Sequence, residues 1–136
     1  MRAREAVARA TLRLADAGVE SPQYEAEILL ADVLGVPHTR LGLAEDVTED
    51  QVEAFDALVM RRSRREPLQH LTGVSGFRYV EVAVGPGVFV PRPETELLAG
   101  WAVDRLTGIA VETDCRPVVV DLCTGSGAIA LALTTE

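Results

Sequence analysis

The stretch VVVDLCTGSGAIA, residues 118–130, sets the expected fold of the C-terminal part of this chain. Three valines lead to Asp121, a turn rich in small residues follows, and a helix-forming segment begins at Ala128. This order predicts a strand, a glycine loop and a helix N-terminus. A ligand can approach glycine closely because glycine has no Cβ, and free N–H groups at a helix start favour a polar or anionic group. The stretch therefore predicts the start of a nucleotide-type site.

The segment upstream of this stretch has the pattern of a β-hairpin. Apolar residues alternate with other residues over positions 77–84, which predicts one strand. Gly85-Pro86-Gly87 predicts a turn, and residues 88–90 predict a second short strand. A hairpin is therefore expected ahead of the nucleotide-type site.

A stiff segment and a helix connect this hairpin to the opening strand. Two prolines flank Arg92 and predict an extended path that holds the arginine in a fixed direction. Glu94 and Glu96 follow in the first turn of the predicted helix, where carboxylates complement the helix dipole. Gly108 is expected to end the helix, and residues 109–116 are expected to form a loop. The buried face of the helix is predicted to comprise Leu97, Leu98, Trp101 and Ala102.

The N-terminal half has the pattern of a small helical bundle. Apolar residues recur at helical spacing over residues 3–17 and again over residues 22–34. A brief helical turn or a loop is expected over residues 36–44. Thr48-Glu49-Asp50-Gln51 has the spacing of a capping box, which predicts the start of a third long helix. The apolar stripe of that helix comprises Val52, Phe55 and Val59.

Composition limits the classes of function. The chain of 136 residues carries a net charge of −8, which disfavours non-specific nucleic-acid binding because such binding needs a positive field. Its basic residues are all arginine, and the cluster Arg61-Arg62-Ser63-Arg64-Arg65 is expected to be a solvated face at a helix end. The alternative for this cluster is a contact with an acidic partner or with RNA. No apolar run approaches the roughly 20 residues that span a bilayer, so no membrane partner is expected.

The few cysteines and histidines add little chemistry. Cys115 and Cys123 are too few for a disulfide framework, and free thiols in a cytoplasmic protein are the simpler interpretation. Cys123 is expected to be a small buried residue with negative φ rather than a catalytic thiol. His38 and His70 are isolated in the sequence, so no metal site is predicted.

The glycine loop fits two ligand classes. Residues 125–130 match the dinucleotide fingerprint G-x-G-x-x-G/A, which many strand-to-helix turns also match by chance. Counted from the carboxylate, the pattern Asp121-x-Cys123-x-Gly125-x-Gly127 resembles the first motif of S-adenosylmethionine-dependent methyltransferases. A tight turn without a ligand is the third interpretation, and the loop alone does not choose among them.

Three segments in order resemble one family. They are EPLQHLTG at residues 66–73, VPRPETE at residues 90–96, and DLCTGSGAIAL at residues 121–131, preceded by the helical bundle. Together they are similar to the HemK/PrmC family, the N(5)-glutamine methyltransferases of peptide chain release factors. The PRPETE segment is the more specific of these signals. The chain departs from the family pattern at Arg65, where glycine is common, at His70, where tyrosine is frequent, and at Cys123, where the first glycine of the loop is usual.

The resemblance implies a mixed fold with three parts. Residues 1–70 would be an all-α bundle that helps to dock the release factor, and residues 71–92 a β-hairpin linker. Residues 93–136 would begin a Rossmann-like, S-adenosylmethionine-dependent methyltransferase domain. Asp121, Cys123, Thr124, Gly125, Ser126 and Gly127 would contact S-adenosyl-L-methionine. Arg92, Pro93, Glu94 and Thr95 would lie beside the cleft for cofactor and substrate.

The resemblance also implies what lies outside this chain. The family's Asn-Pro-Pro-Tyr motif is absent from these residues and is expected downstream of Glu136, so no catalytic residue is assigned here. The chain by itself is expected to be an inactive N-terminal half. An unpaired apolar strand at residues 118–122 would then favour disorder or self-association. Two alternatives stay open: a fragment of a dinucleotide-dependent oxidoreductase, and a non-catalytic module that binds release factors.

Overall fold

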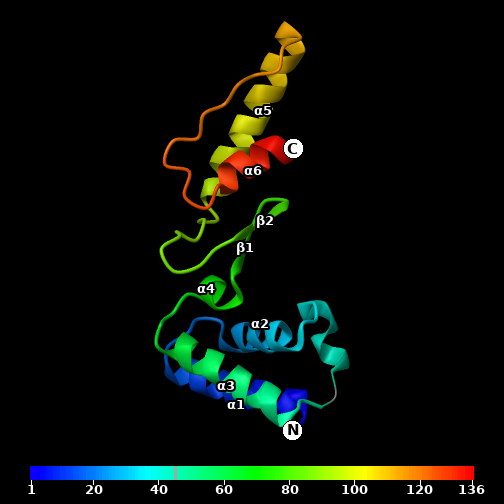
Figure 1. Ribbon diagram of the computed structural model, residues 1–136, viewed down its shortest axis with the longest axis vertical. Helices are drawn as coiled ribbons and strands as arrows, with labels where there is room; N and C mark the ends of the chain where they lie inside the picture. The colour runs from blue at the N-terminus through cyan, green and yellow to red at the C-terminus, as the bar shows by residue number, and fades with distance from the viewer. Residues whose placement is uncertain (45) are drawn as a thin grey trace. The chain divides into compact units, whose positions relative to one another are not determined.

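A computed structural model describes residues 1–44 and 46–136 of the chain (Figure 1). The chain divides into two compact units, Met1–Thr72 and Gly73–Glu136, which are described separately below. The first unit is helical, and the second contains a two-stranded antiparallel sheet and two helices. Within the described ranges, none of the helices is both long and apolar enough to cross a membrane.

The first two helices of the first unit form where their sequence patterns predict them. Helix α1 spans Ala3–Asp16, and α2 spans Pro22–Leu34 with proline in its first turn. Gly35 ends α2 with φ of 63°, a left-handed conformation that glycine adopts without strain. The predicted turn after α2 is the 3-10 helix η1, His38–Leu43. Short-range signals therefore place these elements correctly.

Helix α3, Glu49–Ser63, begins with the predicted capping box. The backbone N–H of Gln51 donates to Thr48 Oγ1 at 3.3 Å, and the N–H of Thr48 donates to Gln51 Oε1 at 3.0 Å. A short helix, α4, spans Leu68–Thr72 directly after Pro67 and lies outside the helices that the sequence pattern predicts. Proline is compatible with a helix start, since the first N–H groups of a helix need no intrahelical acceptor.

The core of the first unit lies among α1, α2 and α3, which pack against one another (Figure 1). Alanines on α1 and α2 let the helices approach closely, while Phe55 and Val59 of α3 are fully or almost fully buried. The buried residues of this core are Ala3, Ala6, Ala10, Leu14, Val19, Ala26, Leu29, Leu30, Ala31, Leu41, Val47, Phe55 and Val59.

The second unit begins with a β-hairpin whose strands differ from those predicted. Strand β1, Val74–Phe77, pairs antiparallel with β2, Val80–Ala83, so that Phe77 lies opposite Val80. The predicted second strand at residues 88–90 is wrong, because β2 finds its partner upstream instead. Arg78 and Tyr79 form the two-residue turn without the glycine or asparagine that usually marks one.

Helix α5 spans Thr95–Thr113, so the expected end at Gly108 and the expected loop from residue 109 are wrong. A glycine within a helix costs about 1 kcal/mol, which is too little to stop an otherwise favourable helix. The predicted buried face is also wrong for its large residues, because Leu97, Leu98 and Trp101 are 80%, 55% and 65% exposed. Ala99 is the fully buried residue of this helix.

The predicted opening strand at residues 118–122 is not formed. This segment has no strand partner among the described residues, and Val118, Val120 and Leu122 are 91%, 74% and 82% exposed. A strand requires hydrogen bonds to a neighbouring strand, so an apolar run alone cannot make one. The Rossmann-like start therefore remains a prediction.

Helix α6, Ala128–Thr135, follows the glycine loop and packs against α5 and β2 (Figure 1). Ala128 and Ala132 lie one helical turn apart and are buried in the core of the second unit. The buried residues of that core are Phe77, Val82, Val84, Ala99, Ala128 and Ala132. The hairpin, α5 and α6 are thus held together by one small core.

Candidate functional site

The glycine loop has a tight backbone with little covering it. Gly125 and Gly127 have φ of 60° and 79°, and a Cβ added to either would meet no heavy atom within 4 Å. These positions need glycine for their left-handed conformation, and they leave room for a ligand to approach the backbone. The Gly127 N–H donates to the Thr124 carbonyl at 3.0 Å, which closes the turn ahead of α6.

Asp121 stands at the start of this loop and is half-buried. Its Oδ2 accepts a hydrogen bond from Thr124 Oγ1 at 2.8 Å, so the hydroxyl orients the carboxylate. The other loop residues differ in exposure: Ser126 and Gly127 are half-buried, whereas Cys123, Thr124 and Gly125 are exposed. A fixed carboxylate beside an open glycine turn fits an ammonium group of a ligand that lies on the loop.

Cys123 departs from both expectations made for it. The residue is exposed rather than buried, and its φ is +58° rather than negative. Residues 123, 125 and 127 alternate in the left-handed region, so the path of the turn sets the backbone of Cys123. A residue with a Cβ pays of the order of 1 kcal/mol for this conformation. Glycine, which is usual in the resembling family, would avoid that cost.

A hollow of about 620 Å³ lies beside the segment that precedes the loop. Asp121 is the one predicted cofactor residue that lines it. The remaining lining residues come from α5, from α6 and from the exposed segment at residues 116–119: Leu106, Arg116, Pro117, Val119, Ala130, Leu133 and Thr134. The predicted cofactor residues at positions 123–127 do not line this hollow.

The predicted cleft segment forms a turn that leads into α5. The N–H of Thr95 donates to the Arg92 carbonyl at 3.0 Å, and the N–H of Glu96 donates to the Pro93 carbonyl at 3.0 Å. Arg92, Pro93 and Glu94 are exposed, and Thr95 is half-buried. The second half of the segment is therefore turned rather than extended, while the side chains proposed for the cleft remain accessible.

The two groups of predicted residues lie in the same unit but are not in direct polar contact. Within the described residues, no hydrogen bond or ion pair joins Arg92–Thr95 to Cys123–Gly127. The first group precedes α5 and the second precedes α6, and these two helices pack against each other. Their relative placement therefore depends on the contacts that hold α5 and α6.

Sequence reasoning missed the residue that makes many of those contacts. The backbone N–H of Arg78 donates to Glu96 Oε1 at 2.8 Å, and its Nη1 donates to the Glu96 carbonyl at 3.2 Å. Its Nε and Nη2 donate to the two carboxylate oxygens of Glu136 at 2.8 and 2.6 Å. Hydrogen bonding to Glu136 raises the pKa of Arg78, and the same bonding lowers the pKa of Glu136. No signal in the sequence indicated this role, because positions 77–84 were expected to form one strand.

The arginine cluster at the end of α3 is only partly a solvated face. Arg61 pairs with Glu66 and holds the pKa of that carboxyl below its ordinary value. Arg62 forms an ion pair with Glu25 of α2, and both side chains are largely shielded. The prediction of a solvated face is therefore wrong for Arg62. Arg65 has φ of +73°, which explains physically why glycine suits this position.

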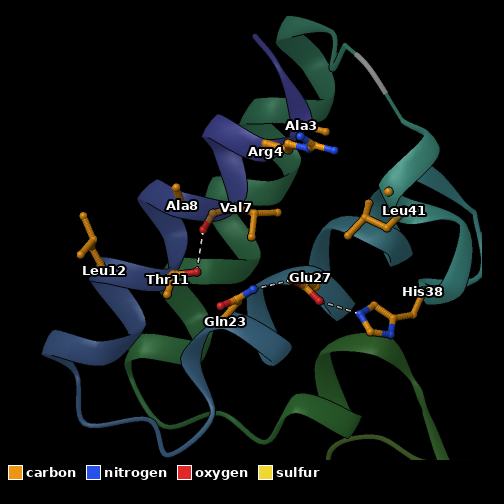
Figure 2. Close-up of a pocket in the computed structure, with 11 residues that line it drawn as sticks. Ala3, Arg4, Val7, Ala8, Thr11, Leu12, Gln23, Glu27, His38 and Leu41 are labelled. Atoms are coloured by element: carbon orange, nitrogen blue, oxygen red, sulfur yellow. Dashed lines mark hydrogen bonds and ion pairs between the residues drawn. The ribbon is translucent and has the colours of Figure 1, made fainter.

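The first unit contains a pocket of about 670 Å³ between α1, α2 and η1 (Figure 2). Glu27 lies on its wall, where its carboxylate accepts from Gln23 at 3.0 Å and contacts His38 Nε2 at 2.8 Å (Figure 2). The hydrogen bond from Gln23, followed by that from His38, lowers the pKa of Glu27. Gln23, Glu27 and His38 thus form a row of interacting polar side chains. In the sequence, only the spacing of four residues between Gln23 and Glu27 indicated this row.

The remaining candidates for metal binding or thiol chemistry are the acidic, histidine and cysteine side chains. The described residues hold no group of three or more His, Cys, Asp or Glu side chains that could bind a metal ion. Both cysteines are exposed and free. His38 is engaged with Glu27 and has its ring edge-to-face with Tyr24 at 5.4 Å between centroids. The loop after Asp121 remains the best candidate for binding a cofactor.

Comparisons with known proteins place the chain in a family. Residues 5–73 match the family model described as the PrmC N-terminal domain. The chain is 55% identical over 130 residues to a release factor glutamine methyltransferase of Streptomyces coelicolor, covering 96% of this chain and 44% of that protein. It is 48% identical over 132 residues to the protein of the same name from Mycolicibacterium smegmatis, covering 97% of this chain and 45% of that protein.

A third relative carries the same name. A release factor glutamine methyltransferase of Escherichia coli is 45% identical over 119 residues, covering 86% of this chain and 41% of that protein. The chain thus spans less than half the length of the curated relatives it matches. From the matching domain and these relatives, the chain belongs to the PrmC family.

Proposed function

We propose that this chain is part of an enzyme that methylates a release factor on glutamine. The reaction would transfer a methyl group from S-adenosyl-L-methionine to the side-chain amide nitrogen of the glutamine in the Gly-Gly-Gln motif. The observation that carries this proposal is the 55% identity, over 96% of the chain, to a protein named release factor glutamine methyltransferase. The loop that follows Asp121 supports it with a geometry suited to the cofactor.

The loop would bind the methionine part of the cofactor. The half-buried carboxylate of Asp121, oriented by Thr124, would accept from the ammonium group. The left-handed turn through Cys123, Gly125 and Gly127 would lie under the methionine part of the cofactor, with Thr124 and Ser126 beside it. When bound, S-adenosyl-L-methionine supplies an electrophilic methyl group on a sulfonium. Residues 93–136 would begin a Rossmann-like domain in which residues 118–122 pair with a neighbouring strand.

The cleft segment would serve the substrate side. An amide nitrogen is a poor nucleophile because its lone pair is delocalised into the carbonyl, so the enzyme must hold it in line with the methyl group. Exposed Arg92, Pro93 and Glu94, together with Thr95, would border the space where the glutamine enters. We assign no catalytic residue to this chain and place the amide acceptors in the part of the relatives that it does not span.

The N-terminal unit would contribute to docking. The pocket between α1, α2 and η1 combines apolar lining with the polar row of Gln23, Glu27 and His38 (Figure 2). Such a surface suits a protein partner better than RNA, in keeping with the net charge of −8. The release factor is the proposed partner, and the cytoplasm is the proposed location.

The test uses the full-length protein that contains this chain. Incubation with a release factor and S-adenosyl-L-methionine should add one methyl group to the glutamine of the Gly-Gly-Gln motif, measured by mass spectrometry of the peptide. Asp121→Asn should weaken cofactor binding in calorimetry about tenfold, because the amide loses the charge that faces the ammonium group. Thr107→Ala on the exposed part of α5 is the matched control and should leave binding unchanged. Absence of methyl transfer by the wild-type protein would refute the proposal.

A further inference from the structure

Arg78 links three elements of the second unit. The residue lies in the turn between β1 and β2, yet it bonds through its backbone N–H and one guanidinium nitrogen to Glu96 in the first turn of α5. The other side of the guanidinium makes a two-point contact with the carboxylate of Glu136, which directly follows α6. A planar guanidinium can serve two directions in this way because its donors are fixed in one plane.

The surroundings of Arg78 are fitted to its side chain. A Cβ added to Gly100 of α5 would lie 2.7 Å from Arg78 Nη1, so the guanidinium, the far end of a flexible side chain, would have to shift away from the helix. Gly100 therefore leaves the space that the guanidinium occupies against the helix. Arg78 also has φ of +51°, a left-handed conformation that is unfavourable for arginine, so its contacts offset a local backbone cost.

The elements that Arg78 joins carry the residues of the proposed site. Glu96 comes directly after Arg92–Thr95, and the N–H bonds of Thr95 and Glu96 close the turn that forms this segment. Helix α6 comes directly after the loop at residues 123–127. A contact that joins Glu96 in the first turn of α5 to Glu136 directly after α6 therefore influences how the cleft segment is placed relative to the cofactor loop.

We infer that Arg78 is a positioning residue for methyl transfer: with Gly100 providing its space, it holds the Arg92–Thr95 segment in register with the helix that follows the cofactor loop. This inference rests on the proposed function. Positioning of this kind affects the alignment of the reacting atoms more than the binding of either ligand. Small displacements of reacting groups cost up to about 100-fold in rate.

The kinetic test compares Arg78→Ala, Gly100→Ala and the double variant in the full-length protein. Each single variant should lower kcat for methylation of the release factor about tenfold, while the Kd for S-adenosyl-L-methionine stays within about twofold. The double variant should be no slower than Arg78→Ala, since the added methyl has no guanidinium to displace. Additive losses would overturn the inference. Arg105→Ala, an exposed arginine on α5, is the matched control and should retain full kcat.

A second measurement keeps the test independent of activity and of folding. Arg78→Lys and Gly100→Ala should accelerate amide hydrogen exchange at Thr95, Glu96 and Leu97, while amides of the first unit keep their protection. Unchanged exchange at these three amides would overturn the inference. If the wild-type protein methylates no release factor, the proposed function fails. The exchange data still decide whether Arg78 positions the segment, as does calorimetric unfolding of Arg78→Ala, Gly100→Ala and the double variant, in which the two losses of stability should not add.

Discussion

The two units of this chain bury their apolar residues to different degrees. In the first unit the large apolar residues of the helical stripes, such as Leu14, Leu29 and Phe55, are fully buried. In the second unit Leu97, Trp101 and Val118 are mostly exposed, and the core consists of Phe77 with a few small and medium side chains. The first unit contains the partners that its helices need. The second has several large apolar side chains that the described residues leave exposed.

The largest expected effect contrasts one aromatic residue from each unit. Phe55 is fully buried on α3, so Phe55→Ala should lower the free energy of unfolding of the first unit by about 3–5 kcal/mol. Trp101 is 65% exposed on α5, so Trp101→Ala should change the stability of the second unit by less than about 0.5 kcal/mol. Urea unfolding followed by far-UV circular dichroism measures both. Equal losses of unfolding free energy in the two variants would show that Trp101 stabilises its unit despite its exposure.

A second contrast concerns the arginines at the end of α3. Arg62 and its partner Glu25 are 15% and 14% exposed in their side chains, and removing the arginine leaves a shielded carboxylate without its cation. Arg62→Ala should therefore destabilise the first unit by about 2 kcal/mol. Arg64→Ala, at an exposed position two residues away, should cost less than about 0.5 kcal/mol. The idea of a shielded pair fails if the two substitutions have the same effect in urea.

The helix starts of the two units offer a smaller contrast. Thr48 caps α3 through its hydroxyl, and Thr48→Ala should cost about 1 kcal/mol of stability. Glu94 occupies the same position ahead of α5 but makes no side-chain capping bond, so Glu94→Ala should be nearly neutral for stability. Thermal unfolding of both variants provides the measurement, with Thr48→Ser as a conservative control that restores the cap. A cost at Glu94 as large as that at Thr48 would contradict the difference.

The smallest expected effect is on the pH dependence of stability. A hydrogen bond from Arg61 lowers the pKa of Glu66 in the first unit, and one from Arg78 lowers the pKa of Glu136 in the second. A folded-state pKa below the unfolded value stabilises the fold above the unfolded value, and this contribution disappears as pH falls through the folded value. The urea midpoint should therefore decrease as the pH is lowered below about 4.5.

Substitutions separate the two units in that measurement. Glu66→Gln should reduce the decrease of the urea midpoint at low pH when unfolding is followed by far-UV circular dichroism. Glu136→Gln should reduce this decrease when unfolding is followed by the fluorescence of Trp101, which is the single tryptophan and lies in the second unit. Asp32 serves as a control of opposite sign. Burial raises its pKa, so its contribution is largest at low pH and falls as pH rises. If both glutamine variants keep the wild-type decrease of the urea midpoint at low pH, the two arginine–glutamate pairs do not stabilise the fold as stated.

Much of the first unit was predictable from sequence, and less of the second. The capping box at Thr48, the left-handed Gly35 and the stripe of α3 all depend on residues within one or two turns of each other. The strand partners of the hairpin and the contacts of Arg78 depend on residues far apart along the chain. The misplaced strand at residues 88–90 shows that a strong turn signal cannot identify which strands pair.

The candidate site shows the same division. Asp121 and the glycines of the loop could be selected from their order and spacing, because a strand–turn–helix pattern is local. The exposure and left-handed backbone of Cys123 could not, since they follow from the path of the whole turn. The fit between Gly100 and Arg78 required the packing of α5 against the hairpin turn.

By itself, the sequence determined the three long helices of the first unit, the family and the position of the glycine loop. These features are encoded by hydrogen bonds and residue types close together in the chain. Only the tertiary structure decided which apolar faces are buried, where the hairpin pairs and how Arg78 joins α5 to α6. Burial and strand pairing depend on partners contributed by distant residues, and a local pattern specifies the need for such a partner without identifying it.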